Sequence, residues 1–178
     1  MNIERAIFIV SGIPGAGKTT VSRLLAQRFQ RGVHVEADVL QKLIVTGGLW
    51  PDGKPADEAE RQLRLRGRNA CMIADSFFEA GFTPVVDNVV IASHVEVHRE
   101  AIVNRPLLFV MLAPHSDVVR ERDATRSDKH VFHKYGHLDE VVRNETPRVG
   151  LWIDSSDLTA EETVDVILRD AWQAAQLA

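Results

Sequence analysis

The amino-acid sequence predicts an α/β fold, in which helices flank a doubly wound sheet of about five mostly parallel strands. Short apolar stretches alternate along the chain with longer segments whose apolar residues recur at the helical period. This alternation is typical of β-α-β units. With 178 residues, 45% of them hydrophobic, the chain is long enough for one domain with a sizeable core, so we expect residues 1–178 to form a single domain.

The expected strands are short segments rich in Val, Ile, Leu or Phe, near residues 5–11, 33–36, 83–87, 106–112 and 150–153. The helices are expected to begin at Lys18, Asp38, Asp57, Ser93, Ser116 and Thr159, with a further one over 138–144. Ser93-x-x-Glu96 and Thr159-x-x-Glu162 match the capping box at a helix start. Residues 46–55, with three glycines and two prolines, and the polar residues 125–137 are expected to be loops.

Composition narrows the classes of partner. The net charge of −4 provides no basic field for a nucleic-acid backbone, which favours a small-molecule partner. The single cysteine, Cys71, permits no internal disulfide and suits a reducing compartment, so we expect a cytoplasmic protein. The sequence contains no run of eighteen apolar residues, so no membrane span is expected. Nothing in the sequence specifies an oligomeric state.

One motif joins the first expected strand to the first expected helix. It reads Gly-x-x-x-x-Gly-Lys-Thr from Gly12 to Thr19. Glycines let backbone amides turn inward at such a bend, and the helix N-terminus adds partial positive charge, so the loop forms a nest for phosphate oxygens. Lys18 is expected to act as a catalytic cation at the β- and γ-phosphates, and the Thr19 hydroxyl to bind Mg²⁺. The expected nucleotide-binding residues are Gly12, Ile13, Pro14, Gly15, Ala16, Gly17, Lys18, Thr19 and Thr20.

The motif therefore predicts the P-loop NTPase type of α/β fold, with ATP and Mg²⁺ bound at the carboxyl edge of the sheet. A guanine-reading Asn-Lys-x-Asp sequence is absent, which counts against the signalling GTPases, and no feature of this short chain marks a ring ATPase. A kinase is the leading class.

Three further segments accompany the P-loop: Val-Glu-Ala-Asp at 35–38, Pro-Val-Val-Asp-Asn at 84–88, and an arginine-rich stretch at 120–126 that precedes a polar segment. In these features the chain resembles, over nearly its whole length, the P-loop kinase family that includes chloramphenicol phosphotransferase, shikimate kinase and gluconate kinase. The resemblance implies an ATP-dependent phosphotransferase that moves the γ-phosphate to a hydroxyl of a small molecule, such as an antibiotic, a sugar acid or a nucleoside. The substrate-facing segments do not match chloramphenicol phosphotransferase well enough to transfer its substrate.

Two aspartates follow expected strands. By the resemblance Asp38 is the general base or orients the acceptor hydroxyl, whereas Asp38-x-x-Gln41 also reads as a helix-capping pair. Asp87 ends its strand as a Walker-B carboxylate does and is expected to hold Mg²⁺, directly or through water. The alternatives are a turn with Asn88, or a substrate-orienting Asp87 that leaves Asp38 near the metal.

Arg122 and Arg126 share a helix face just ahead of residues 125–137, which the resemblance identifies as a lid. We expect these arginines to stabilise the transferring phosphoryl group. A lid arginine stacks on adenine in related kinases, which makes Arg120 or Arg122 a candidate for that contact. The opposing interpretation is a solvated charged helix face.

The long helix over 57–80 is expected to place Phe77 on its core side and Arg61, Arg64 and Arg68 opposite. These arginines either line an acceptor cleft or lie in solvent, and Trp50 either walls a pocket or closes the edge of the core. Two other functions stay open: a zeta-toxin-like or polynucleotide 5′-hydroxyl kinase, and a nucleotide-dependent binding switch with little catalysis.

Overall fold

A five-stranded parallel sheet forms the centre of the computed structural model, which describes residues 5–125 and 132–177. The strand order is β2-β3-β1-β4-β5, and each neighbouring pair is parallel. The strands are β1 (Ile7–Ser11), β2 (Gly32–Glu36), β3 (Thr83–Asp87), β4 (Leu107–Leu112) and β5 (Leu151–Ile153). This confirms the predicted fold class, and each strand lies within two residues of its expected bounds.

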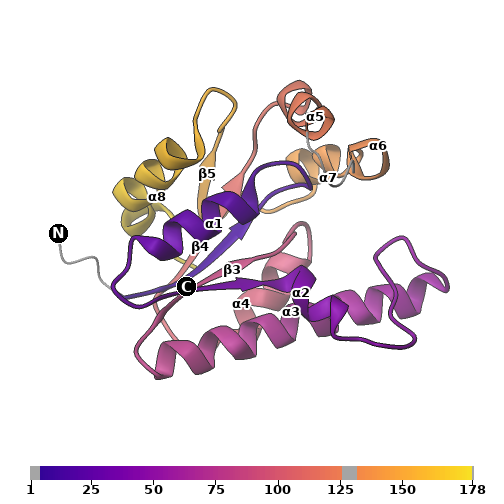
Figure 1. The fold of residues 1–178 in the computed structure, drawn as a ribbon, viewed down its shortest axis with the longest axis horizontal. Helices are drawn as coiled ribbons and strands as arrows, with labels where there is room; N and C mark the ends of the chain where they lie inside the picture. The colour runs from indigo at the N-terminus through magenta and orange to yellow at the C-terminus, as the bar shows by residue number, and fades with distance from the viewer. Residues whose placement is uncertain (1–4, 126–131, 178) are drawn as a thin grey trace.

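The three central strands are buried because helices cover both of their faces (Figure 1). Every residue of β1, β3 and β4 is buried, whereas the edge strands β2 and β5 are only partly buried. On one face α1 packs against α8, and on the other α3 packs against β3 and α4. The carboxyl ends of the strands all point to the same edge, where the loops that follow β1, β2 and β3 meet.

The helices are α1 (Lys18–Gln27), α2 (Ala37–Lys42), α3 (Ala56–Glu79), α4 (His94–Ala101), α5 (Ser116–Ala124), α6 (Phe132–Tyr135), α7 (Leu138–Asn144) and α8 (Ala160–Ala174). The starts expected at Lys18 and Ser116 and the helix expected over 138–144 are confirmed. The short helix α6 was not expected, because it lies inside the polar segment 125–137. Residues 126–131 of that segment, and with them Arg126, fall outside the described residues.

Of the two predicted capping boxes, one is confirmed. At the start of α8 the Glu162 amide donates to Thr159 Oγ1 at 3.1 Å, and the Thr159 amide donates to Glu162 Oε2 at 2.8 Å. The box at Ser93 is wrong: Ser93 already has helical backbone angles and makes no side-chain cap. The Glu96 carboxylate instead accepts from Arg99, three residues further along the helix, which satisfies it without the Ser93 amide.

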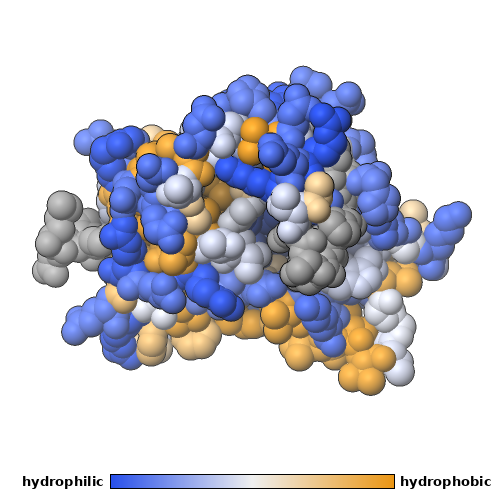
Figure 2. Space-filling model, turned by 45° about the horizontal axis from the view of Figure 1, so that its top comes forward, coloured by the Kyte–Doolittle hydropathy of each residue, from blue (hydrophilic) through white to orange (hydrophobic). Residues whose placement is uncertain are grey.

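The α3 helix buries Phe78, whereas Phe77, which was expected in the core, is 37% exposed. Phe77 contacts the ring of Phe82 edge-on. In Figure 2 hydrophilic side chains cover much of the face, and apolar side chains gather on its left side and along its lower edge. Among the described residues no helix is both long and apolar enough to cross a membrane.

Candidate active site

The loop from Gly12 to Gly17 turns the chain sharply between β1 and α1. Gly15 and Gly17 have φ angles of +93° and +91°, a left-handed conformation that other residues rarely adopt. A Cβ atom on Gly15 would also lie 2.8 Å from Val119 Cγ1, so this glycine allows α5 to pack directly against the loop. Gly17 is the N-cap of α1, and the first-turn amides of a helix are free to bind anions.

Lys18, Thr19 and Thr20 form the first turn of α1, directly after this loop. The Lys18 ammonium group donates to the Ile13 carbonyl at 3.1 Å and so lies across the loop. The residues that the sequence predicts to bind phosphate therefore lie in the bend after β1 and in the first turn of α1. The bend has the geometry of an anion nest.

Asp87, at the end of β3, is almost completely buried beside this nest. Burial alone would raise the pKa of its carboxyl group, but His34, Lys18 and the Thr19 hydroxyl together lower the pKa below its usual range. His34 Nε2 lies 3.5 Å from Asp87 Oδ2, and this buried carboxylate oxygen accepts no hydrogen bond. An ionised oxygen without a donor, next to a threonine hydroxyl, is the kind of ligand that Mg²⁺ prefers.

A cation at this position would also need oxygen ligands from a phosphate. Within the described residues, no group of three or more His, Cys, Asp and Glu side chains converges to hold a metal ion. Mg²⁺ is usually held by one or two carboxylates together with substrate phosphates, so the pair Thr19 and Asp87 fits Mg²⁺ bound with a nucleotide.

Asp38 lies in the first turn of α2, on the same edge of the sheet. Its carboxylate Oδ1 accepts from Arg66 Nη1 at 3.1 Å, and its side chain is 44% exposed. The capping alternative for Asp38 is wrong, because Glu36 is the N-cap of α2 and makes no side-chain cap. The Gln41 side chain is engaged elsewhere, with the Leu49 carbonyl at 2.9 Å. Asp38 is thus a partly exposed carboxylate that is paired with a buried cation, the guanidinium group of Arg66.

Arg66 was not predicted as a site residue. Its side chain is only 5% exposed, although it belongs to the same helix as the solvent-facing arginines. Burial lowers the pKa of its guanidinium group, and the nearby Asp38, Tyr135 and Asp87 offset part of this effect. Arg61 and Arg64 pair instead with Glu58 and Glu60 on the α3 surface, as the solvated alternative predicted.

The loop over 46–55 is held against α3 and reaches Arg66. Gln62 holds the loop by accepting from the Leu49 amide at 2.7 Å and donating to the Gly47 carbonyl at 2.9 Å. Trp50 is brought close to Arg66, with its ring centroid 6.0 Å from the guanidinium carbon. The loop also reaches helix α6: the Tyr135 hydroxyl donates to Asp52 at 3.0 Å, and Lys134 pairs with the same carboxylate.

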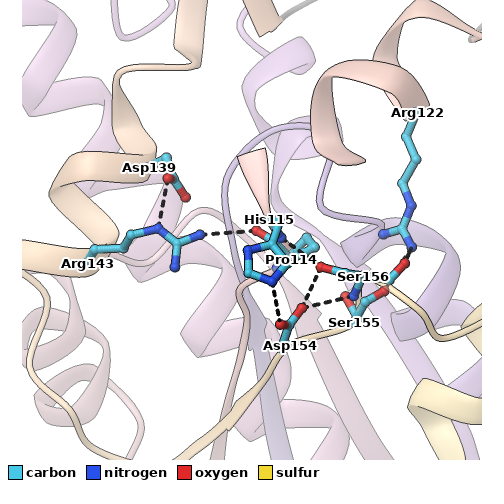
Figure 3. Close-up of polar contacts among 8 residues, drawn as sticks. All are labelled: Pro114, His115, Arg122, Asp139, Arg143, Asp154, Ser155 and Ser156. Atoms are coloured by element: carbon cyan, nitrogen blue, oxygen red, sulfur yellow. Dashed lines mark hydrogen bonds and ion pairs between the residues drawn. The ribbon is translucent and has the colours of Figure 1, made fainter. Parts of the chain in front are cut away.

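Arg122, near the end of α5, lies on the other side of the P-loop. Its Nη2 atom donates to the carbonyls of Ser155 at 2.8 Å and Ser156 at 3.2 Å, in the loop between β5 and α8 (Figure 3). The side chain is therefore anchored on this loop. Arg120 is exposed and pairs with Asp117.

The same loop is fixed by a second group of contacts. Asp154 accepts from the Ser156 hydroxyl at 2.5 Å and lies 3.2 Å from His115 Nε2 (Figure 3). The His115 amide donates to Ser156 Oγ at 2.8 Å, and Arg143 on α7 reaches the Pro114 carbonyl at 3.3 Å. These contacts connect the ends of β4 and β5 with α7. They give the loop a defined shape next to Arg122.

Among solved structures, a sugar kinase from Janibacter sp. HTCC2649 aligns with a TM-score of 0.69 at 16% identity, over 93% of this chain and 94% of that one. APS kinase CysC from Mycobacterium tuberculosis, in complex with AMPPNP and APS, aligns with a TM-score of 0.68 at 16% identity, over 93% and 96%. Shikimate kinase from Acinetobacter baumannii, in complex with shikimate, gives 0.59 at 22% identity, over 94% and 96%. These likenesses concern the fold.

A curated relative, the UPF0200 protein of Aeropyrum pernix, is 32% identical over 101 residues. The match spans 55% of this chain and 54% of the relative, so it covers about half the length of either protein. The model of the chloramphenicol phosphotransferase-like protein family matches residues 5–173, nearly the whole chain. This match confirms the resemblance noted in the sequence. The chain therefore belongs to the chloramphenicol phosphotransferase-like family.

Proposed function

We propose that this protein is an ATP-dependent phosphotransferase that moves the γ-phosphate of ATP to a hydroxyl group of a small molecule. One observation carries the proposal: a half-exposed carboxylate, Asp38, is held by the buried Arg66 at the same sheet edge as the phosphate-binding loop. A carboxylate so placed can orient an acceptor hydroxyl and receive its proton, a contribution that phosphoryl transfer uses and nucleotide binding alone does not require.

In the proposed reaction the acceptor oxygen forms a bond to the γ-phosphorus while the bond from phosphorus to the β–γ bridging oxygen breaks. ADP leaves with that oxygen, and the hydroxyl proton passes to the Asp38 carboxylate. Lys18 and the loop amides hold the phosphate tail and neutralise the charge that develops on it. Thr19 and Asp87 would hold Mg²⁺, which when bound neutralises and aligns the phosphate oxygens.

Arg122 is proposed to serve the nucleotide rather than the phosphoryl group. Its helix packs on the P-loop through Val119, and its guanidinium is anchored on the loop over 155–158. A planar cation fixed there offers a face on which a purine base stacks. The APS kinase neighbour holds AMPPNP and APS together, so this fold accommodates a nucleotide beside a small second substrate.

The experiment is a transfer assay with γ-labelled ATP, Mg²⁺ and a panel of hydroxyl compounds: sugar acids, shikimate, chloramphenicol, nucleosides and a 5′-hydroxyl oligonucleotide. We expect a labelled small-molecule product from the wild type and at least a hundredfold lower kcat from Asp38→Asn, about the contribution of a general base. The control is Asp165→Asn, which removes an exposed carboxylate on α8 that pairs with Arg28.

Asp38→Asn also leaves Arg66 without its carboxylate, so folding of the variant is checked by circular dichroism, and its ATP affinity by calorimetry. A folded variant that binds ATP and transfers phosphate at the wild-type rate would overturn the role of Asp38. Tight ATP binding by the wild type, with no product from any acceptor, would instead support the binding switch. Labelled oligonucleotide alone would support the polynucleotide kinase.

A further inference from the structure

A buried chain of side chains continues from Arg66 away from the site, and its members come from three elements. Arg66 on α3 donates through Nη2 to Asn88 Oδ1 at 3.3 Å, just after β3. The Asn88 amide nitrogen lies 3.1 Å from His98 Nε2 on α4, and His98 Nδ1 lies 2.8 Å from the His94 carbonyl. Asn88 is 4% exposed and His98 2%, so water does not compete for these bonds.

These contacts determine which nitrogen of His98 carries the proton. A carbonyl oxygen only accepts hydrogen bonds, so Nδ1, which faces the His94 carbonyl, carries the hydrogen. Burial lowers the pKa of His98 to about 4, so the ring is neutral at pH 7. Nε2 is then a bare acceptor, and the Asn88 amide nitrogen must donate to it.

The histidine tautomer in turn sets the orientation of the Asn88 amide. With its nitrogen on His98, Asn88 directs Oδ1 to Arg66 Nη2 and to the Val89 amide, which donates to it at 2.9 Å. A reversed amide would place donor against donor at both of these contacts and acceptor against acceptor at His98 Nε2, leaving three groups unsatisfied. Arg66 therefore has one terminal nitrogen, Nη2, held by Asn88 and the other, Nη1, on Asp38.

The space around His98 is also restricted. Gly67, one residue after Arg66, has no side chain, and a Cβ atom there would lie 2.9 Å from His98 Cε1 and 3.0 Å from Nε2. The imidazole ring thus packs directly on the α3 backbone, at the nitrogen that accepts from Asn88. A side chain at this position of α3 would displace the ring from Asn88.

We propose that His98 and Asn88 are positioning residues for the phosphoryl-transfer reaction, which act through Arg66 to hold the Asp38 carboxylate in its reactive orientation. This inference rests on the proposed function of Asp38. It assigns a role to a neutral histidine that has no contact with either substrate site. The tautomer of His98 fixes the Asn88 amide, and Asn88 in turn fixes the Arg66 guanidinium that holds the Asp38 carboxylate.

Three variants test the proposal. His98→Phe keeps a ring but removes both nitrogens, Gly67→Ala displaces the ring, and His98→Gln keeps a donor for the His94 carbonyl and an acceptor for Asn88. Cys71→Ala is the control, because it removes a buried atom from α3 outside the chain of contacts. Circular dichroism and thermal unfolding establish that each variant is folded.

The first measurement needs no acceptor. Nitrogen-15 spectra of the wild type at pH 7 should show a His98 ring protonated only at Nδ1, with distinct Arg66 guanidinium signals. Those arginine signals should shift in His98→Phe and Gly67→Ala, and return toward the wild type in His98→Gln. A ring protonated at Nε2, or Arg66 signals that stay the same in His98→Phe, would overturn the proposal even if the protein is a kinase.

The second measurement uses the acceptor found in the transfer assay. His98→Phe and Gly67→Ala should lower kcat by about tenfold to a hundredfold, the usual effect of a misplaced reacting group, with the KM for ATP within twofold of the wild type. His98→Gln should recover most of kcat, and Cys71→Ala should retain it. An unchanged kcat in folded His98→Phe would overturn the positioning role, whereas a wild type without any transfer would overturn the proposed function and leave the spectra to decide on the contacts.

Discussion

Acidification should destabilise this protein through His98, and the structure gives the size of the effect. The ring is buried, and this burial, with smaller contributions from the charges of His94 on the same helix and Arg66 on α3, lowers its pKa from 6.5 to about 4. The hydrogen bond to the His94 carbonyl raises the pKa and offsets part of this effect. Glu60 and Arg64 face the neighbouring His94 ring. Because the unfolded chain binds the His98 proton more readily than the folded one, stability is full above pH 6.5 and falls as the pH approaches 4. The gap corresponds to about 3 kcal/mol of unfolding free energy.

The assay is urea unfolding followed by circular dichroism at several pH values between 7.5 and 4.5. Carboxylates also titrate toward the acid end of this range, so the quantity that matters is the difference between the wild type and His98→Phe, whose ring stays uncharged. We expect the unfolding free energy of the wild type to drop by roughly 2 to 3 kcal/mol more than that of the variant over this range. Parallel pH profiles for the two proteins would refute the neutral, buried state assigned to His98.

Gly15→Ala combines a φ of +93° with a Cβ contact at 2.8 Å to Val119, so its ATP affinity, measured by calorimetry, should fall at least tenfold. The control is Gly47→Ala, at a φ of +73° with no atom within 4 Å of the added Cβ, which should leave the ATP affinity unchanged. Asp87→Asn should reduce the gain in ATP affinity that Mg²⁺ provides; an equal gain in both proteins would argue against a metal role. Thr159→Ala should lower the unfolding free energy by about 1 kcal/mol, with ATP affinity intact, because it removes the cap of α8.

The sequence predicted the fold correctly for the buried central strands and for the loop that follows the first of them. Strands β1 and β4 are nearly continuous apolar runs, which is typical of a sheet covered on both faces, and the P-loop marks the edge at which ligands bind. Helix α6 was not predicted because its four residues are too few to show a helical periodicity and carry no start signal. The capping box at Ser93 was wrong because Ser93 itself has helical backbone angles, whereas a capping serine has an extended backbone.

The site could be predicted only in its local part. The P-loop residues follow one another in the chain, so a single sequence motif predicts their shared geometry. Arg66 meets Asp38 and Asn88 from 28 and 22 residues away, and an arginine on a charged helix is usually solvated. The signal that could have found it is its position: Arg66 falls on the buried side of α3, beside Gln62 and Gly67. Arg122 likewise has carbonyl partners more than thirty residues away.

The proposed nucleotide site is tested most directly by calorimetric titration of ATP into the wild-type protein and Lys18→Ala, each with and without Mg²⁺. We expect one binding site per chain, affinity that increases with Mg²⁺, AMP binding far weaker than ATP binding, and at least tenfold weaker ATP binding by Lys18→Ala. If no purine triphosphate binds in a magnesium-dependent manner, or if AMP binds as tightly as ATP, the loop does not hold a triphosphate and the proposed nucleotide site is contradicted.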